Sequence, residues 1–210
     1  MTDGNILPFN PLDKKNLGES VAQALLEQPP VRLPDVQKFR GAGVYAIYYS
    51  GKFPAYKPLA EANAGGRPAT PIYVGKAVPA GARKGGDLEA DPKFALYDRL
   101  QDHAKSIEQA ENLEVRDFCC RYLVVDDIWI PLGEALLIAR FSPLWNKVID
   151  GFGNHDPGKG RHEGLRPRWD VLHPGRPWAA RCKDRPETAA LIKSEALNFL
   201  RNSPPSDGHG

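Results

Sequence analysis

Cysteine and methionine are scarce in this sequence, which contains three cysteines and one methionine among 210 residues. Cys119 and Cys120 are adjacent, so they cannot easily form a disulfide bond with each other, and Cys182 is far from both in the sequence. No Cys-X-X-Cys pair occurs, although such pairs are typical of zinc sites. We therefore expect the cysteines to be small, buried apolar side chains in a reducing compartment, with zinc binding as the less favoured alternative.

Long apolar segments are also missing. The sequence has no apolar run long enough to span a bilayer and no apolar N-terminal segment that resembles a signal peptide. A cytoplasmic protein that does not bind membranes is therefore expected. The formal net charge is only +2, which neither requires nor excludes nucleic acid as a partner.

The composition that remains is that of a globular protein. Hydrophobic residues make up 41% of the chain and charged residues 26%, which is unlike a disordered protein. The length fits one domain of ordinary size with additions at its ends. The 20 glycines and 20 prolines predict many loops.

The order of apolar patterns and breakers predicts the order of helices and strands. Helices are expected at residues 20–28, from Asp91 and Pro92 to about Ala110, at 131–141 and at roughly 186–200, and strands at 44–49, 71–75 and 114–125. Residues 50–70 and 151–177 are rich in glycine and proline, and they are predicted to be a long irregular insertion and a loop-dominated segment.

The predicted fold class is α+β, a small domain with a central antiparallel sheet flanked by helices. We divide the chain into an N-terminal extension (1–40) with a short helix, a core (41–150) and a C-terminal extension (151–210) that ends in a helix.

Two polar residues interrupt the apolar stripe of the helix predicted at 91–110. Leu96, Leu100 and Ile107 follow helical spacing, and Arg99 and His103 lie beside them, one turn apart. A charged group near a buried stripe is costly unless something anionic meets it. For a lone Arg or His, a structural ion pair is the favoured explanation.

The helix predicted at 131–141 shows the same pattern. Glu134 lies on its apolar stripe, where a carboxylate must be protonated, paired or bound to a cation. Pairing with Arg99 is the structural alternative. Tyr45 and Tyr73 lie on the two predicted strands, and each buried hydroxyl needs a partner. Together the five side chains offer what phosphodiester cleavage requires: a base, a cation that stabilises charge and a carboxylate for a metal.

The order of these residues resembles that of a known nuclease family. Gly43-Val44-Tyr45 and Tyr73-Val74-Gly75-Lys76 are similar to the paired strands of the GIY-YIG nucleases. Arg99-Leu100 with His103, Glu134, and Pro143-Leu144-Trp145-Asn146 resemble the motifs that follow. Further segments, such as PLWNKVIDGFGNHDPGKGR and WDVLHPGRPWA, resemble the type II restriction endonucleases of SacII-type specificity. That branch implies a homodimer that cuts the palindrome CCGCGG.

The resemblance implies a role for each residue. Tyr45 would deprotonate the attacking water with help from His103, and Tyr73 would contact the scissile phosphate. Arg99 would stabilise the transition state. Glu134 would hold a single divalent ion, Mg²⁺, and Asn146 would fix the geometry of that site. Lys76 would contact a phosphate. An ordinary solvated lysine is an equally good interpretation of Lys76.

Double-stranded DNA is the expected partner, and a cognate DNA methyltransferase is expected genetically rather than as a subunit. Residues 151–185 hold eight Lys and Arg against four Asp and Glu, a local charge of +4. Arginine can bind guanine through two hydrogen bonds, which would suit a G·C target. The predicted DNA contacts are Asn154, His155, Arg161, Arg166 and Arg168. A solvated, arginine-rich loop is the alternative.

The sequence departs from the family in the long connection between its two tyrosine motifs, residues 46–72, which supplies a segment that could reach DNA or a second subunit. Two other functions stay open at this stage. One is a repair or mobile-element nuclease of looser specificity, and the other is a DNA-binding module that has lost cleavage.

Overall fold

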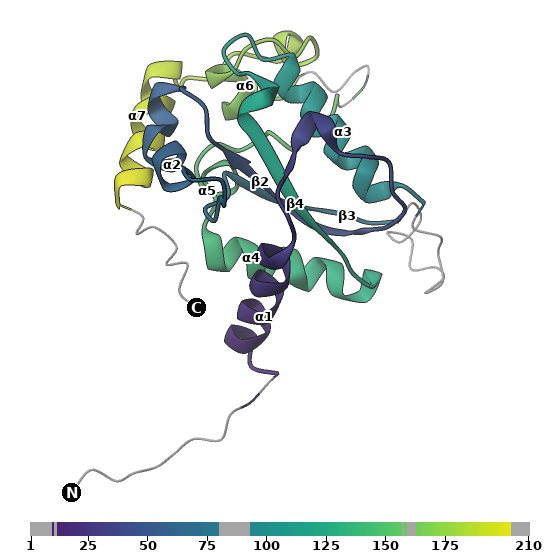
Figure 1. Ribbon diagram of the computed structural model, residues 1–210. Coiled ribbons are helices and arrows are strands. Elements are labelled where there is room, and N and C mark those ends of the chain that lie inside the picture. The colour runs from purple at the N-terminus through teal and green to yellow at the C-terminus, as the bar shows by residue number, and fades with distance from the viewer. Residues whose placement is uncertain (1–9, 11, 80–92, 157, 159–162, 203–210) are drawn as a thin grey trace, which may run out of the picture.

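A single four-stranded antiparallel sheet forms the centre of the computed structural model (Figure 1), which describes residues 10, 12–79, 93–156, 158 and 163–202. The strands lie in the order β1 (Val31–Arg32), β4 (Phe118–Val124), β2 (Gly43–Tyr49) and β3 (Tyr73–Ala77). All neighbouring strands are antiparallel, so the predicted α+β architecture is confirmed. β2 is central and β3 is an edge strand.

Two helices cover one face of the sheet, below it in Figure 1. These are α1 (Lys14–Glu27) and α4 (Ile130–Phe141), which pack against each other and against the sheet. Because side chains alternate along a strand, Val44, Ala46 and Tyr48 of β2 point into this layer.

The opposite face carries the rest of the chain. Its elements are α2 (Lys57–Ala62), α3 (Ala95–Glu108), α5 (Leu144–Lys147), α6 (Arg168–Leu172) and α7 (Ala189–Asn202). Tyr45, Ile47 and Tyr49 of β2 point into this layer, where they share one buried cluster with Trp169 and Ile192 of the C-terminal extension. The extension is therefore packed onto the core and contributes to its hydrophobic interior.

Several element boundaries differ from prediction. Helix α1 begins six residues before residue 20, because the Asp13 side chain accepts a hydrogen bond from the Lys15 amide and caps it. Strand β4 is shorter than predicted, since Val115–Asp117 forms a 3-10 helix. The two-residue strand β1 was not predicted. Helix α3 begins at Ala95, and its predicted start at Asp91 and Pro92 lies outside the described residues. The remaining 3-10 helices are η1 (Leu33–Asp35), η2 (Pro54–Tyr56), η5 (Asp127–Trp129) and η6 (Ala179–Arg181).

The prediction that residues 50–70 are irregular is wrong for their first half. They form η2 and α2, and they bury Tyr56 and Leu59 in the main core cluster. Asn63 closes the insertion: its side chain donates to the carbonyls of Tyr49 and Thr70 and accepts from the Thr70 amide. The prolines are compatible with helix because they occupy first turns, where no amide hydrogen is needed.

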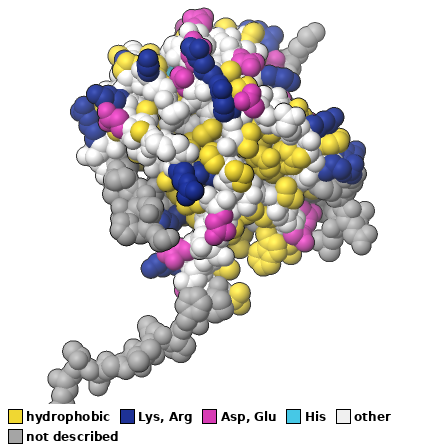
Figure 2. Space-filling view, in the orientation of Figure 1, with side chains coloured by type: hydrophobic (Ala, Val, Ile, Leu, Met, Phe, Trp, Pro, Cys, Tyr) yellow, Lys and Arg dark blue, Asp and Glu magenta, His cyan; other side chains and the backbone are white. Residues whose placement is uncertain are grey.

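Exposed hydrophobic side chains gather where β4 ends and α4 begins, beside α1 on the face drawn in Figure 2. Val124, Ile128 and Trp129 are each more than half exposed there. The predicted burial of cysteine, in contrast, is confirmed for Cys120 and Cys182, while Cys119 is half-buried.

Candidate active site

Three of the predicted catalytic side chains meet between β2, β3 and α3. The Tyr45 hydroxyl lies 2.5 Å from Nε2 of His103, and both side chains are buried. The Tyr73 ring centre is 5.3 Å from that of His103 and 6.3 Å from that of Tyr45. The antiparallel register explains this convergence, because it pairs Tyr45 with Gly75, two residues after Tyr73.

Gly75 is required for this close packing. A Cβ atom at Gly75 would lie 2.4 Å from the Tyr45 hydroxyl oxygen and 3.0 Å from a ring carbon of Tyr73. No side chain fits there unless one of the two tyrosines moves.

We therefore expect Gly75→Ala to displace the Tyr45 hydroxyl. The DNA cleavage that the family resemblance implies should be about 100-fold slower in this variant, because a misplacement of about 1 Å costs that much in a catalytic site. The variant should also lose about 1–3 kcal/mol of stability through overpacking. Single-turnover cleavage and urea denaturation measure the two effects. Gly18→Ala on α1 is the matched control, since a Cβ there meets nothing closer than 3.5 Å; equal effects in both variants would contradict the assignment.

Arg99 is held by a segment of the C-terminal extension. It lies one turn before His103 on α3, and its guanidinium donates to the Gly153 carbonyl at 2.8 Å and contacts Nε2 of His155. The neighbouring Phe152 stacks on His103 with ring centres 4.5 Å apart. His155, one of the predicted DNA contacts, therefore lies against Arg99, in contact with the predicted catalytic cluster.

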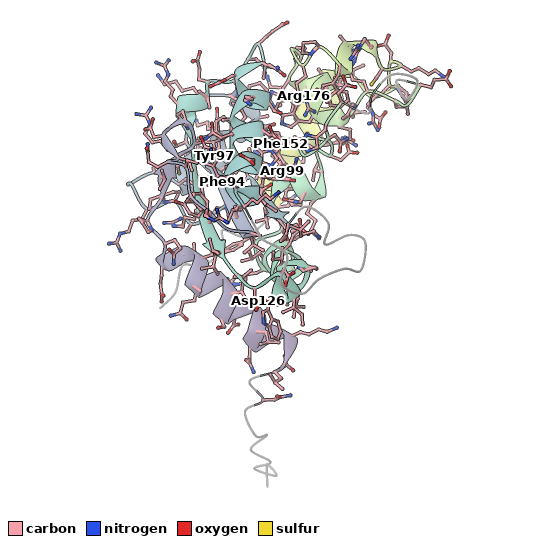
Figure 3. The ribbon with its side chains drawn as sticks, turned by 90° about the vertical axis from the view of Figure 1, so that its right-hand side faces the viewer. Phe94, Tyr97, Arg99, Asp126, Phe152 and Arg176 are labelled. Atoms are coloured by element: carbon pink, nitrogen blue, oxygen red, sulfur yellow. The ribbon has the colours of Figure 1, made fainter. Side chains whose placement is uncertain are left out.

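A buried arginine fixes that segment. Arg176 is 2% exposed, and it forms two hydrogen bonds with the Asp170 carboxylate and three with the carbonyls of Gly151, Phe152 and Asn154. Its guanidinium also lies over the rings of Trp169 and Trp178. Figure 3 shows Arg99, Phe152 and Arg176 close together where the extension meets α3. Although Arg176 contributes to the basic charge of residues 151–185, it is an interior residue.

Glu134 approaches from α4, on the other side of edge strand β3. One carboxylate oxygen lies 2.6 Å from Nζ of Lys76, and the two side chains are 22% and 38% exposed. Glu134 does not form the ion pair with Arg99 that is the structural alternative. Arg99 instead forms hydrogen bonds with the 153–155 segment. The Glu134 charge nevertheless acts on the site, because it raises the pKa of both Tyr45 and Tyr73 in addition to the larger effect of burial.

Asn146 holds the strand that carries Tyr73 and Lys76. Its side-chain oxygen accepts from the Val74 amide and its side-chain nitrogen donates to the Val74 carbonyl, both at 2.8 Å. Edge strand β3 is thus fixed on its free side by two hydrogen bonds that mimic a further strand. Because the side-chain amide of Asn146 forms its hydrogen bonds with the backbone of Val74, Asn146 supports the position of strand β3 in the site.

Comparison with known protein families identifies the family of this chain. A family model described as the Eco29kI GIY-YIG domain matches residues 37–200, most of the chain. The chain belongs to this family. No curated protein matches the sequence at a significant level. The Eco29kI GIY-YIG domain is a restriction-type nuclease domain, so the chain is a nuclease that acts on DNA. Within the described residues, no helix is long and apolar enough to cross a membrane.

The match extends through the C-terminal extension to α7. The segment that holds Arg99, and the Arg176 that fixes it, are therefore part of the Eco29kI GIY-YIG domain. Sequence reasoning missed this arrangement. The local sequence gives one signal, the separation of Asp170 and Arg176 by six residues, but nothing in it shows that the pair is buried.

Burial sets the protonation of the Tyr45–His103 pair in this domain. It raises the pKa of the Tyr45 phenol well above its ordinary value, an effect that Tyr73 adds to and Arg99 opposes. Burial, followed by the charge of Arg99, lowers the pKa of His103 well below its ordinary value. The neutral imidazole can therefore accept the phenol proton at Nε2 when its own proton is on Nδ1.

The predicted DNA-contacting residues differ in their surroundings: two arginines form ion pairs, and two residues line a cleft. Arg166 pairs with the exposed Asp184 at 3.1 Å, and Arg168 pairs with Glu195 of α7. Asn154 and His155 line an open cleft of about 380 Å³ together with Leu165 and Trp178, among other residues. Arg161 lies outside the described residues.

A second buried histidine ties the insertion to the extension. His173 is fully buried: its Nε2 lies 2.6 Å from the Tyr56 hydroxyl and its Nδ1 lies 2.7 Å from the Asn112 side-chain oxygen. The Trp145 indole donates to the same hydroxyl at 3.0 Å. Every polar atom of this network is satisfied when His173 is neutral, and burial lowers its pKa to about 3.

We expect the protein to lose stability in mild acid because of this histidine. The unfolded chain binds a proton at His173 below a pKa of about 6.5, but the folded chain does not until the pH nears 3. The stabilisation is thus complete above about pH 6.5 and falls as the pH drops, by about 2 kcal/mol between pH 7 and pH 5. Urea denaturation at both values measures it. The stability of His173→Gln should depend less on pH by that amount, and an unchanged dependence would contradict the prediction.

Proposed function

We propose that the protein is a type II restriction endonuclease that hydrolyses double-stranded DNA at a short G·C palindrome, CCGCGG. The observation that carries the proposal is the convergence of the Tyr45–His103 pair, Tyr73 and Arg99 beside Glu134 at the β2–β3 edge of a restriction-type nuclease domain. The palindrome is supported by the resemblance of the flanking segments to SacII-type enzymes.

In the proposed reaction, a water oxygen bonds to the scissile phosphorus and a phosphorus–oxygen ester bond breaks. Tyr45 takes the proton of this water as it passes its own to Nε2 of His103, along their 2.5 Å hydrogen bond. Arg99 favours loss of the Tyr45 proton, because its charge lowers the pKa of Tyr45 against the effect of burial, although the same charge also lowers the pKa of the acceptor His103. The guanidinium of Arg99 and the hydroxyl of Tyr73 stabilise the charge on the phosphate oxygens.

Glu134 is the residue that would hold a divalent ion, Mg²⁺. A single half-buried carboxylate suits this ion, which keeps several waters and is commonly bound by one or two carboxylates and by substrate phosphates. The described residues contain no cluster of three His, Cys, Asp or Glu side chains, so a site with several protein ligands is not formed by them. Positive charge beside Glu134 would favour ionisation of Tyr45 and stabilise the phosphate charge.

DNA would lie along the face where β3, α3 and the 151–155 segment meet. Lys76 would contact phosphate after leaving Glu134, and Asn154 and His155, which line the cleft beside Arg99, would also contact the DNA. Of Arg166 and Arg168, Arg166 would contact DNA more readily, because its partner Asp184 is itself exposed and can release it. Arg168 is 18% exposed and would have to break its pair with Glu195. Arg161 stays a proposed contact on sequence grounds alone.

We further propose a homodimer, because a palindrome presents the same half-site twice and a two-fold dimer reads both. The exposed apolar side chains of Val124, Ile128 and Trp129 support a second copy of the chain as their partner. Light scattering should give the mass of two chains, and Trp129→Glu should give the mass of one. A cognate methyltransferase, encoded separately, would protect the host DNA.

The deciding experiment is a digest of long DNA of known sequence with the full chain and Mg²⁺, followed by sequencing of the fragment ends. The proposal predicts discrete fragments whose ends all lie within CCGCGG. Cuts at branches, bulges or long asymmetric sites would instead identify a repair or mobile-element nuclease. Binding without cleavage would identify a DNA-binding module.

A further inference from the structure

The ion pair between Lys76 and Glu134 lies where the proposed function needs a cation. The carboxylate of Glu134 is 22% exposed and has Nζ of Lys76 at 2.6 Å, so the chain itself supplies a positive charge to this carboxylate. The other nearby cation, Arg99, is directed to the Gly153 carbonyl and to His155.

Lys76 is built so that its ammonium group can leave while its backbone stays. The strand around it is held by the two hydrogen bonds between Asn146 and Val74 and by pairing with β2. Its side chain, in contrast, is 38% exposed at the edge of the sheet, and its four-carbon stem is flexible. An ion pair of this exposure is weak, and a divalent cation competes with it through twice the charge.

We propose that Lys76 is a resident counterion of Glu134, which a divalent ion displaces, and that the released ammonium group then binds a phosphate of the DNA. This inference rests on the proposed function, because it takes Glu134 as the metal ligand. The exchange breaks no covalent bond. Before metal and DNA bind, Lys76 compensates the charge of Glu134. The exchange makes the binding of the divalent ion and the binding of DNA cooperative.

The first test is calorimetric titration of the full chain with Mn²⁺ in the absence of DNA. Lys76→Gln should bind the ion about five-fold more tightly than the unchanged protein, because the metal no longer has to break an ion pair. Lys147→Gln is the matched control: it removes the same charge from an exposed residue next to Asn146. Equal affinities of the Lys76→Gln and Lys147→Gln variants would overturn the proposal.

Glu134→Gln separates this failure from that of the proposed function. If Glu134→Gln no longer binds Mn²⁺ but Lys76→Gln gains nothing, Glu134 is the ligand and only the counterion inference is wrong. If Glu134→Gln binds Mn²⁺ as well as the unchanged protein, both the proposed metal ligand and the inference built on it are wrong.

The second test measures the cooperation between metal and DNA. In a Tyr45→Phe background, which cuts slowly enough for binding to be measured, Mg²⁺ should tighten binding to a CCGCGG duplex about five-fold more than it does in Tyr45→Phe/Lys76→Gln, because only the former can transfer Lys76 to phosphate. The same tightening in both proteins would overturn the transfer of Lys76 to DNA.

Discussion

The Glu134→Gln variant should cut DNA at least about 1,000-fold more slowly than the unchanged protein while it still binds its target. The amide keeps the size of the carboxylate but removes the charge that a hard cation needs, and a bound metal contributes several kcal/mol to the transition state. Loss of the pair with Lys76 should change stability by less than about 1 kcal/mol, because both side chains are partly exposed. Affinity for DNA should hold or rise, since one negative charge facing phosphate is gone.

Single-turnover cleavage and gel-shift titration separate the two effects. Asp98→Asn is the matched control, because Asp98 is an exposed carboxylate on α3, next to Arg99 in the chain. It should cut within a few-fold of the unchanged protein. A Glu134→Gln variant that retains a tenth or more of the cleavage rate would show that Glu134 does not hold an essential metal.

The core of the fold was predictable because its patterns are local. Val44 to Tyr49 is a run of β-branched and aromatic residues bounded by glycine, and it forms β2 at the predicted place. The prediction fails for the insertion at residues 50–70, because prolines usually indicate loops. Tyr56 and Leu59 are buried there by contacts with α7, more than a hundred residues later in the chain, and no local pattern contains that information.

The site was predictable in outline for a similar reason. His103 and Glu134 interrupt apolar helix faces, and such residues need partners that the sequence does not name. The partners turned out to be Tyr45 and Lys76, which lie on neighbouring strands. His155 is predicted from the sequence as a DNA contact, and this stays a prediction. The sequence does not show that the hydrogen bonds of Arg176 to the neighbouring loop carbonyls hold this segment against α3, where His155 contacts Arg99.

Tyr45→Phe should lose about 1,000-fold in cleavage rate with the fold intact. The change removes one oxygen atom from a fully buried ring, so packing against Gly75 and Tyr73 is preserved. Nε2 of His103 loses its partner at 2.5 Å, which should cost about 1–3 kcal/mol of stability. The rate falls because water would lose its proton acceptor, a contribution typically between about 100-fold and 10,000-fold. Single-turnover cleavage, with circular dichroism as the check on folding, measures both.

The partner variant His103→Gln decides whether the two residues act together. If Tyr45 passes its proton to His103, either variant alone breaks the transfer, and Tyr45→Phe/His103→Gln should cut no more slowly than the slower single variant. If instead Tyr45 acts on water alone and His103 only packs beneath Phe152, the two losses should multiply. The 2.5 Å hydrogen bond between the Tyr45 hydroxyl and the neutral imidazole favours the first outcome. Burial, which lowers the pKa of His103, leaves Nε2 unprotonated but also makes the imidazole a weaker base.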